Sequence, residues 1–573
     1  MPVFSNAPQE SMNTQSLIEL GKALFQNGQY PEAQLKFAEA VLAESGNAEH
    51  KALFVQSLTG RPFPRYDETI KQAIMFCFAE NTLRHLPLFF SWHALLLHAP
   101  ETAILARIEA CETYEDMRTL LAEAQDSYSP LLNSAFLQQG LKKLLIKNYA
   151  FERVLTGLRR YVLLEASPKE CAKHKPFLSA LATQCFFNEY LFYVTAEEQA
   201  KLDHLRHKLT ETADETEILL YACYRPLWDA PDAQSLLTRF SGDACSADMV
   251  ELLQIQIEDP LEERRLKDTI KPFGAISDQT SQAVQAQYEE HPFPRWVACG
   301  HTRSGEKAKL SAGRKILIAG CGTGQQAVTA AMNFPLAELT AIDLSKASLA
   351  YAHRKAEEYG QTNITFRHGD ILDVASLGER FDYIVCGGVL HHMKVPEDGF
   401  RALKGVLKPD GIMRIALYSE IARRQIVAVQ NWIMEQGFPP TSEGIRDFRK
   451  RFMEGGYRDI FTANTAIPYF DCFSVSETRD LFFHVQEHRF TCPALKDILS
   501  SLALDLLVFA PEAYGLHQRY RQLFPDDPHA TNLDNWHIIE QNNPGLFIGM
   551  YKFYTAPKGQ HAPGAIPAWL AMG

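Results

Sequence analysis

Three glycines at alternate positions follow a short apolar run in the stretch ILIAGCGTGQQ, residues 316–326. Gly320, Gly322 and Gly324 can adopt turn conformations closed to other residues, and they carry no side chain that would keep a ligand away from the backbone. Backbone N–H groups at the start of the helix expected after this turn can bind an anionic group. The spacing therefore predicts a site for a phosphate, a dinucleotide or another nucleoside cofactor.

The residues after the glycines narrow this choice. A phosphate-binding loop of the G-x-x-x-x-G-K-[ST] type needs a Lys-Ser or Lys-Thr pair, and none follows here. A dinucleotide fingerprint stays open, because Gly322, Gly324 and Ala327 fit G-x-G-x-x-A and Asp343 lies about twenty residues further on. Taken alone, the glycines do not separate NAD from S-adenosylmethionine, since both lay a ribose across the first two strands of a parallel sheet.

Four later stretches complete the pattern: AID at 341–343, HGD at 368–370, FDYIVCGGVLHHM at 381–393 and LKPDGIMRIALYS at 407–419. Together with GCGTG, and in this order, they resemble the motifs of class I S-adenosylmethionine-dependent methyltransferases. The resemblance favours S-adenosylmethionine over a dinucleotide. One position departs from the family, because Ile318 stands where many members have an acidic residue that helps to order the methionine end of the cofactor.

The resemblance implies a role for each stretch. Asp343 would accept hydrogen bonds from both ribose hydroxyls, Asp370 would accept one from the adenine amino group, and Ile371 would pack on the adenine ring. Gly387 would leave room for the methyl group. The implied cofactor-binding residues are Gly320, Cys321, Gly322, Thr323, Gly324, Asp343, Leu344, Asp370, Ile371, Cys386, Gly387 and, from the segment before the core, Tyr288.

Two histidines follow the fourth predicted strand, near the place where a methyl acceptor must lie. His391 or His392 could take a proton at neutral pH, so both are candidate catalytic residues, although LHH is frequent here in methyltransferases with varied substrates. His484, Glu487 and His488 spell H-x-x-E-H, a pattern that also occurs in zinc proteases. No third ligand is indicated, so we expect no metal site, and structural hydrogen bonds are favoured over contacts with substrate.

Short apolar runs alternate with helical patterns from about residue 311 onward, which predicts a parallel sheet covered by helices. The expected fold class is α/β, with a Rossmann-like seven-stranded methyltransferase sheet in the C-terminal half and an all-α region before it. Gly21, Ala33, Phe37 and Ala40 fit the small and apolar positions of one tetratricopeptide-like repeat. Thr195 followed by Glu198 predicts a capping box at the start of a helix.

The segment QYEEHPFPRW, residues 287–296, stands before the first strand and resembles one that precedes the methyltransferase core in bacterial proteins with a helical N-terminal region. A weaker resemblance links the chain to rickettsial protein-lysine methyltransferases. The expected divisions are a tetratricopeptide-like hairpin at 1–48, a helical domain at 49–270, a linker and active-site cap at 271–310, the cofactor-binding core at 311–420, a substrate or lid insertion at 421–500, the end of the sheet at 501–556 and a loose tail at 557–573.

Composition limits the partners and the compartment. The net charge of -12 makes the chain a poor general binder of nucleic acid, and the fourth strand lacks the (Asp/Asn)-Pro-Pro-(Tyr/Phe) sequence that serves nucleobase amines. The eleven cysteines form no CxxC pair, and neither a signal peptide nor a membrane span is indicated, so we expect a cytoplasmic location. The expected activity is methylation of a protein side-chain amine, lysine first. The alternatives are a small-molecule acceptor and a cofactor-binding regulatory protein, and a homodimer is possible.

Overall fold

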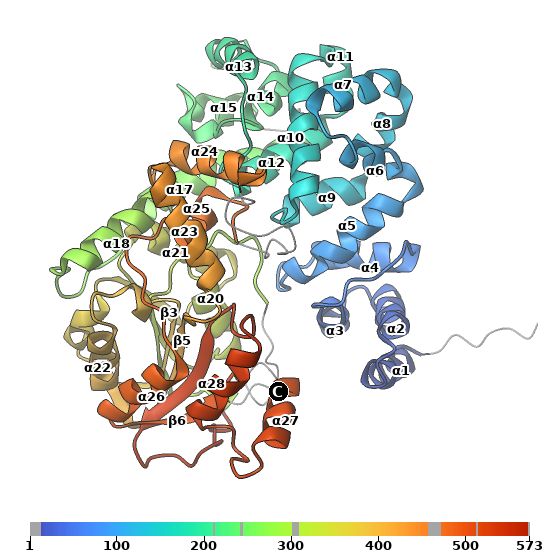
Figure 1. Cartoon of the computed structure of the whole chain (residues 1–573). Coiled ribbons are helices and arrows are strands. Elements are labelled where there is room, and N and C mark those ends of the chain that lie inside the picture. Colours follow the sequence, from blue (N-terminus) through green and yellow to red (C-terminus); the bar gives the residue numbers. More distant parts are fainter. Residues whose placement is uncertain are drawn as a thin grey trace, which may run out of the picture. The chain divides into compact units, whose positions relative to one another are not determined.

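The computed structural model describes residues 13–209, 212–240, 245–300, 309–456, 471–510 and 514–570. These residues form two compact units (Figure 1). The first contains the described residues up to Ile257 together with Val297–Gly300, and the second contains Glu258–Trp296 and the described residues after 300. Parts of the predicted hairpin, cap, insertion and tail therefore lie outside the described residues.

The first unit is helical, as the sequence predicts. Gly21 lies in the first helix where a Cβ would come within 2.7 Å of the Phe37 ring in the second, so the two helices pack closely as a hairpin. The predicted capping box is present, because the Thr195 side chain accepts from the Glu198 N–H and the Glu198 carboxylate accepts from the Thr195 N–H. The tetratricopeptide assignment stays a prediction.

The helices of this unit are α1 (Thr14–Gln26), α2 (Tyr30–Ala43), α3 (Ala48–Leu58), α4 (Glu68–Phe78), α5 (Phe89–His98), α6 (Ile104–Glu109), α7 (Tyr114–Glu123), α8 (Gln125–Leu132), α9 (Ala135–Lys143), α10 (Tyr149–Leu164), α11 (Pro168–Lys173), α12 (Lys175–Phe187), α13 (Ala196–Lys208), α14 (Glu215–Ala222), α15 (Ala233–Arg239) and α16 (Ala247–Leu253). No helix in the described ranges combines the length and apolar character needed to cross a bilayer.

The second unit contains a seven-stranded sheet in the order β3-β2-β1-β4-β5-β7-β6, which confirms the predicted fold class. The first five strands in this order are parallel, and β7 runs antiparallel to β5 and β6. The strands are β1 (Lys315–Ala319), β2 (Glu338–Asp343), β3 (Ile364–His368), β4 (Phe381–Gly387), β5 (Leu407–Leu417), β6 (Leu504–Phe509) and β7 (Tyr551–Pro557).

Helices accompany the sheet because its central strands are apolar on both faces. Ile316, Leu317 and Ile318 of β1 are all fully buried. The helices of the second unit are α17 (Asp259–Lys267), α18 (Gln279–Glu290), α20 (Gln325–Asn333), α21 (Lys346–Glu358), α22 (Pro396–Val406), α23 (Arg424–Gln436), α24 (Ser442–Met453), α25 (Val475–Phe482), α26 (Cys492–Ser501), α27 (Tyr514–Leu523) and α28 (Leu533–Asn542).

The helical region ends earlier than the sequence predicts, because α17 belongs to the second unit rather than to a domain ending at residue 270. Arg354 of α21 forms ion pairs with Asp259 and Glu263 of α17, at 3.0 and 2.8 Å. These ion pairs and the packing of α17 along α21 attach the helix to the methyltransferase-like sheet. Helical periodicity alone carries no information about the unit on which a helix packs.

The described part of the tail is also not loose. Trp569 packs edge-on against Phe334 and Tyr383, and the Arg314 guanidinium lies 5.1 Å from its ring centre. Leu570 is 3% exposed, and the Gly564 N–H donates to the Leu507 carbonyl of β6. Two apolar side chains therefore anchor a segment whose prolines and glycines suggest an irregular end.

We predict that Trp569→Ala lowers the melting temperature of the second unit by about 2–5 °C, because aromatic packing contributes a few kcal/mol in a unit of this size. Leu523→Ala is the control, since Leu523 is 55% exposed and should change the melting temperature little. Differential scanning calorimetry of the full chain measures both. Equal melting temperatures for the two variants would show that Trp569 does not stabilise the fold, as expected for a loose tail.

Candidate functional site

The carboxyl ends of the parallel strands surround one cavity of about 260 Å³ in the second unit. Ligands of open parallel sheets bind at this edge. The cavity is lined by Ser281, Val284, Tyr288, Phe293, Pro294, Gly320, Cys321, Gly322, Gln325, Gln326, Ile342, Asp343, Leu344, Gly369, Asp370, Ile371, Gly387, Gly388, Val389, His392, Met393, Tyr418, Asp480 and Met550.

The glycine turn after β1 has no room for side chains. Gly322 has φ +52°, and a Cβ there would come within 2.7 Å of the Phe293 carbonyl oxygen. Gly324 has φ +82°, and a Cβ there would come within 2.4 Å of the Ala352 side chain of α21. At these two positions the glycines make room for other segments of the chain as well as for a ligand, a role that the sequence alone does not indicate.

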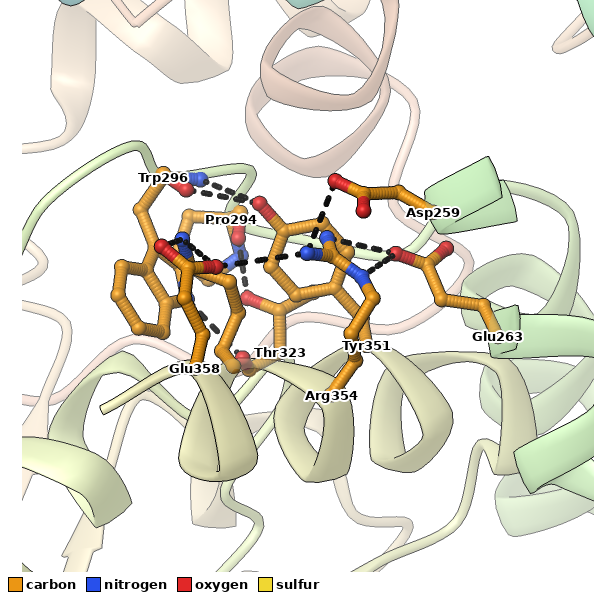
Figure 2. A network of polar contacts seen from close by, with 9 residues as sticks. Asp259, Glu263, Pro294, Trp296, Thr323, Tyr351, Arg354 and Glu358 are labelled. Atoms are coloured by element: carbon orange, nitrogen blue, oxygen red, sulfur yellow. Dashed lines mark hydrogen bonds and ion pairs between the residues drawn. The ribbon is translucent and has the colours of Figure 1, made fainter. Parts of the chain in front are cut away.

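A hydrogen-bonded clamp holds the segment before the core on this turn (Figure 2). The Thr323 hydroxyl donates to the Pro294 carbonyl, and the Trp296 indole N–H donates to the Thr323 carbonyl at 3.0 Å. Tyr351 of α21 donates its hydroxyl proton to the Trp296 carbonyl at 2.7 Å. The clamp places Phe293 and Pro294 at the cavity wall.

The clamp is continued by charged groups along α21. Figure 2 shows Arg354 between the carboxylates of Asp259, Glu263 and Glu358. Its guanidinium also lies 5.1 Å from the centre of the Tyr351 ring. These interactions fix the face of α21 that carries Tyr351, and so they support the position of the clamp.

Two aspartates mark the ends of β2 and β3, of which Asp343 is half-buried and Asp370 is buried. Asp343 accepts from the Gly322 N–H at 2.8 Å and from the Ser345 N–H at 2.9 Å, one bond to each carboxylate oxygen. Burial raises its pKa to about 6, against the opposing effect of these bonds. Asp370 is 3% exposed and accepts from the Leu372 N–H at 2.9 Å. Each carboxylate keeps lone pairs for hydroxyl or amine donors.

The structure brings most of the predicted site residues to the cavity wall. They are Tyr288, Gly320, Cys321, Gly322, Asp343, Leu344, Asp370, Ile371, Gly387 and His392. Thr323, Gly324, Cys386 and His391 lie outside the lining. Thr323 serves the clamp, Gly324 packs on α21, and Cys386 and His391 are completely buried.

The two neighbouring histidines differ in what they can do. His391 is buried with neither ring nitrogen hydrogen-bonded to a described residue, and burial lowers its pKa far below the usual range. His392 lies at the cavity wall, and its Nδ1 lies 2.7 Å from the Gln486 carbonyl oxygen. This nitrogen therefore carries the proton, and Nε2 keeps a lone pair. Burial lowers the pKa of His392 to about 3, so the free imidazole is neutral and a weak base.

Several lining residues were not found by sequence reasoning, above all Asp480 of α25. It accepts a hydrogen bond of 2.6 Å from Tyr288 of α18, a residue 192 positions earlier in the chain. The cavity wall also includes Tyr418, just after β5, and Gln326, at the start of α20. No sequence signal identifies these residues, because the residues around them match no known motif.

The H-x-x-E-H residues point to different partners rather than to one ion. His484 Nε2 lies 3.2 Å from the Tyr288 hydroxyl, and Glu487 pairs with Arg423 at 2.7 and 3.1 Å. The His488 N–H donates to the His391 carbonyl. His484 instead meets His392 and Asp480, and potential ligand atoms of these three lie within 4.8 Å of one another.

Residues 316–411 match the methyltransferase domain family. An uncharacterized protein of Synechococcus sp. is 37% identical over 177 residues, which cover 28% of this chain and 42% of that protein. A ubiquinone biosynthesis O-methyltransferase of Actinobacillus pleuropneumoniae is 36% identical over 113 residues, 19% of this chain and 47% of that enzyme. The chain thus spans less than half the length of each of these relatives.

Among solved structures, PKMT2 from Rickettsia typhi in complex with AdoHcy is 14% identical, with a TM-score of 0.34 over 48% of this chain and 52% of that one. The family match covers the chain from β1 to the first part of β5, which supplies most of the residues that line the cavity. The second unit therefore contains a methyltransferase domain of the class I, S-adenosylmethionine-dependent family.

Proposed function

We propose that the protein transfers the methyl group of S-adenosylmethionine to a side-chain amine of a protein, with lysine as the first candidate. The observation that supports this proposal best is the common cavity of Asp343, Asp370, the glycine turn and Gly387. A cofactor lying along it would meet carboxylates at its ribose and adenine and no side chain at the end of β4. The protein would contribute proximity and alignment for an in-line attack on the sulfonium methyl group.

The residues present suit this cofactor. Asp343 would accept from the ribose hydroxyls, and Asp370 would accept from the adenine amino group beside Ile371. Ile318, in place of the frequent acid, is fully buried within β1. Gln325 and Gln326 line the cavity beside the glycine turn and supply polar groups for the methionine end.

The acceptor would enter at the other end of the cavity, which we call the acceptor end and define as Tyr288, His392, Met393, Tyr418 and Asp480. A carboxylate, hydroxyls and an imidazole lone pair are all acceptors for the N–H donors of an amine. The large helical first unit suits the recognition of a protein. A small-molecule acceptor remains the alternative within this class, and a regulatory protein that binds the cofactor without turnover is the alternative outside it.

We expect Asp343→Ala to weaken S-adenosylmethionine binding by about 1–3 kcal/mol, because a charge-assisted hydrogen bond is lost. Asp505→Ala is a matched control, since Asp505 of β6 also accepts a backbone N–H, from Gly559, but lies outside the cavity. Wild-type affinity should fall as the pH drops through about 6, where Asp343 takes up a proton, and this dependence should be weaker in Asp343→Ala. Calorimetric affinities that are equal in all three proteins would remove Asp343 from the site.

Bulk at the end of β4 should block transfer. A Cβ on Gly387 would meet no atom closer than 3.7 Å, so Gly387→Val should fold while its methyl groups enter the transfer path. We predict a loss of turnover on the order of 10- to 100-fold with little change in melting temperature. Gly405→Val, where a Cβ meets nothing within 4 Å, is the control. Normal turnover in Gly387→Val would place the acceptor elsewhere.

The acceptor class can be identified with tritium-labelled S-adenosylmethionine and a lysate of the source organism, separated into protein, lipid and small-molecule fractions. We expect label in protein, recovered as methylated lysine after hydrolysis. Label in the small-molecule fraction would favour the first alternative. Cofactor binding without any labelled product would favour the regulatory protein.

A further inference from the structure

Asp480 carries a buried charge without a cationic partner. Its carboxylate lies at the cavity wall and is 9% exposed, yet it forms no ion pair with any residue in the described ranges. The nearby cation, Arg423, is already paired with Glu487. Burying a carboxylate without a cationic partner costs free energy of folding. A cationic ligand would provide the missing positive charge.

A chain of hydrogen bonds determines which oxygen of Asp480 is available to a ligand. The Gln486 N–H donates to His484 Nδ1 at 3.2 Å, so the ring proton is on Nε2. That N–H donates to the Tyr288 hydroxyl at 3.2 Å, and Tyr288 donates to Asp480 Oδ1 at 2.6 Å. Within the described residues, Oδ2 of Asp480 has no donor and remains available to a ligand.

His392 supplies a second acceptor at a matching distance. Its Nδ1–H is held by the Gln486 carbonyl, which leaves the Nε2 lone pair without a partner among the described residues. Potential ligand atoms of His392 and Asp480 lie within 4.8 Å of each other. One nitrogen at a normal hydrogen-bond length of about 2.8–2.9 Å from each can bridge that gap. An ammonium group has three N–H donors, whereas a hydroxyl has one.

A metal ion fits these side chains less well. The rings of His392 and His484 are stacked, with centroids 3.6 Å apart and planes at 16°. An imidazole nitrogen offers its lone pair in the plane of its ring, so one ion cannot lie in two stacked planes. The Tyr288 hydroxyl also occupies the position between His484 and Asp480.

We propose that Asp480 is the residue that selects a primary ammonium group as methyl acceptor and removes its proton, with His392 Nε2 as the second acceptor of the same nitrogen. This inference rests on the proposed function. In the step, the ammonium gives one proton to Asp480 Oδ2, and the freed lone pair forms the N–C bond to the methyl carbon. The C–S bond breaks and its electron pair stays on sulfur, so the products are S-adenosylhomocysteine and a methylated ammonium.

The ionisation of the surrounding groups agrees with this assignment. Burial raises the pKa of Asp480 to about 6, against the hydrogen bond from Tyr288, so at neutral pH it is an anion and a stronger base than His392. The other charged or titratable groups around it are Tyr288 of α18, Tyr418 and Arg423 after β5, His484 and Glu487 after α25, and Asp471 before α25.

The test uses the full chain saturated with S-adenosylhomocysteine and two probes of similar shape, n-butylammonium and n-butanol, titrated by saturation-transfer NMR. We expect wild type to bind the ammonium at least tenfold more tightly than the alcohol at pH 7.5, and this preference to shrink as the pH falls through about 6. Asp480→Asn should bind both probes about equally, whereas Asp505→Asn, at a carboxylate outside the cavity, should retain the full preference.

Affinity for S-adenosylhomocysteine is measured first and separates the two proposals. Unchanged affinity of Asp480→Asn for S-adenosylhomocysteine would show that its cavity is folded. If the wild type fails to bind S-adenosylhomocysteine, the proposed function itself is contradicted. Equal binding of the two probes by wild type would overturn the role of Asp480 without any variant. A full preference in Asp480→Asn, or Zn²⁺ bound at one per chain that displaces n-butylammonium, would also overturn it.

Discussion

The close approach of the Phe293 carbonyl to Gly322 is the constraint on which the rest of the site depends. β1, the glycine turn and α20 follow one another in the chain, but they form only part of the cavity wall. Phe293 and Pro294 supply another part, and the Phe293 carbonyl lies where a side chain at residue 322 would be. The clamp between Thr323, Pro294, Trp296 and Tyr351 then fixes the attachment. The clamp joins the glycine turn to the segment that contains Phe293 and Pro294. A shift of that segment would therefore also shift the glycine turn.

Acidic side chains give the cavity wall a negative character. Asp343 is half-buried and Asp480 is buried; desolvation raises the pKa of each to about 6, and neither forms an ion pair with a described residue. A cavity that keeps such groups is suited to cationic guests, and the sulfonium of S-adenosylmethionine is a cation. The protein's own cation at this place, Arg423, is held behind Tyr418 by Glu487 and lies 3.5 Å from the centre of the Tyr418 ring. Arg423 therefore packs against the wall, and its direct ion pair is with Glu487.

The residues after the parallel strands could be placed at one cavity from sequence because they are local to those strands. Buried parallel strands are continuous apolar runs, and the residues that follow them reach the same edge of the sheet. The acceptor end could not be predicted, because Tyr288 and Asp480 meet across 192 positions and neither belongs to a recognisable spacing. The hydrogen bond from Thr323 to Pro294 could not be predicted either, because a motif does not show on which side of its turn a side chain lies. Helical periodicity does not show on which unit α17 packs, and the prolines and glycines of the tail do not show that Trp569 packs against Phe334.

A crystal structure of the protein with S-adenosylhomocysteine would test the proposed site most directly. We expect the ribose hydroxyls on Asp343, the adenine beside Ile371 and Asp370, and the sulfur directed past Gly387 toward His392 and Asp480. A cofactor bound outside this cavity, or bound in it with the sulfur directed away from Asp480, would show that the proposed site is wrong.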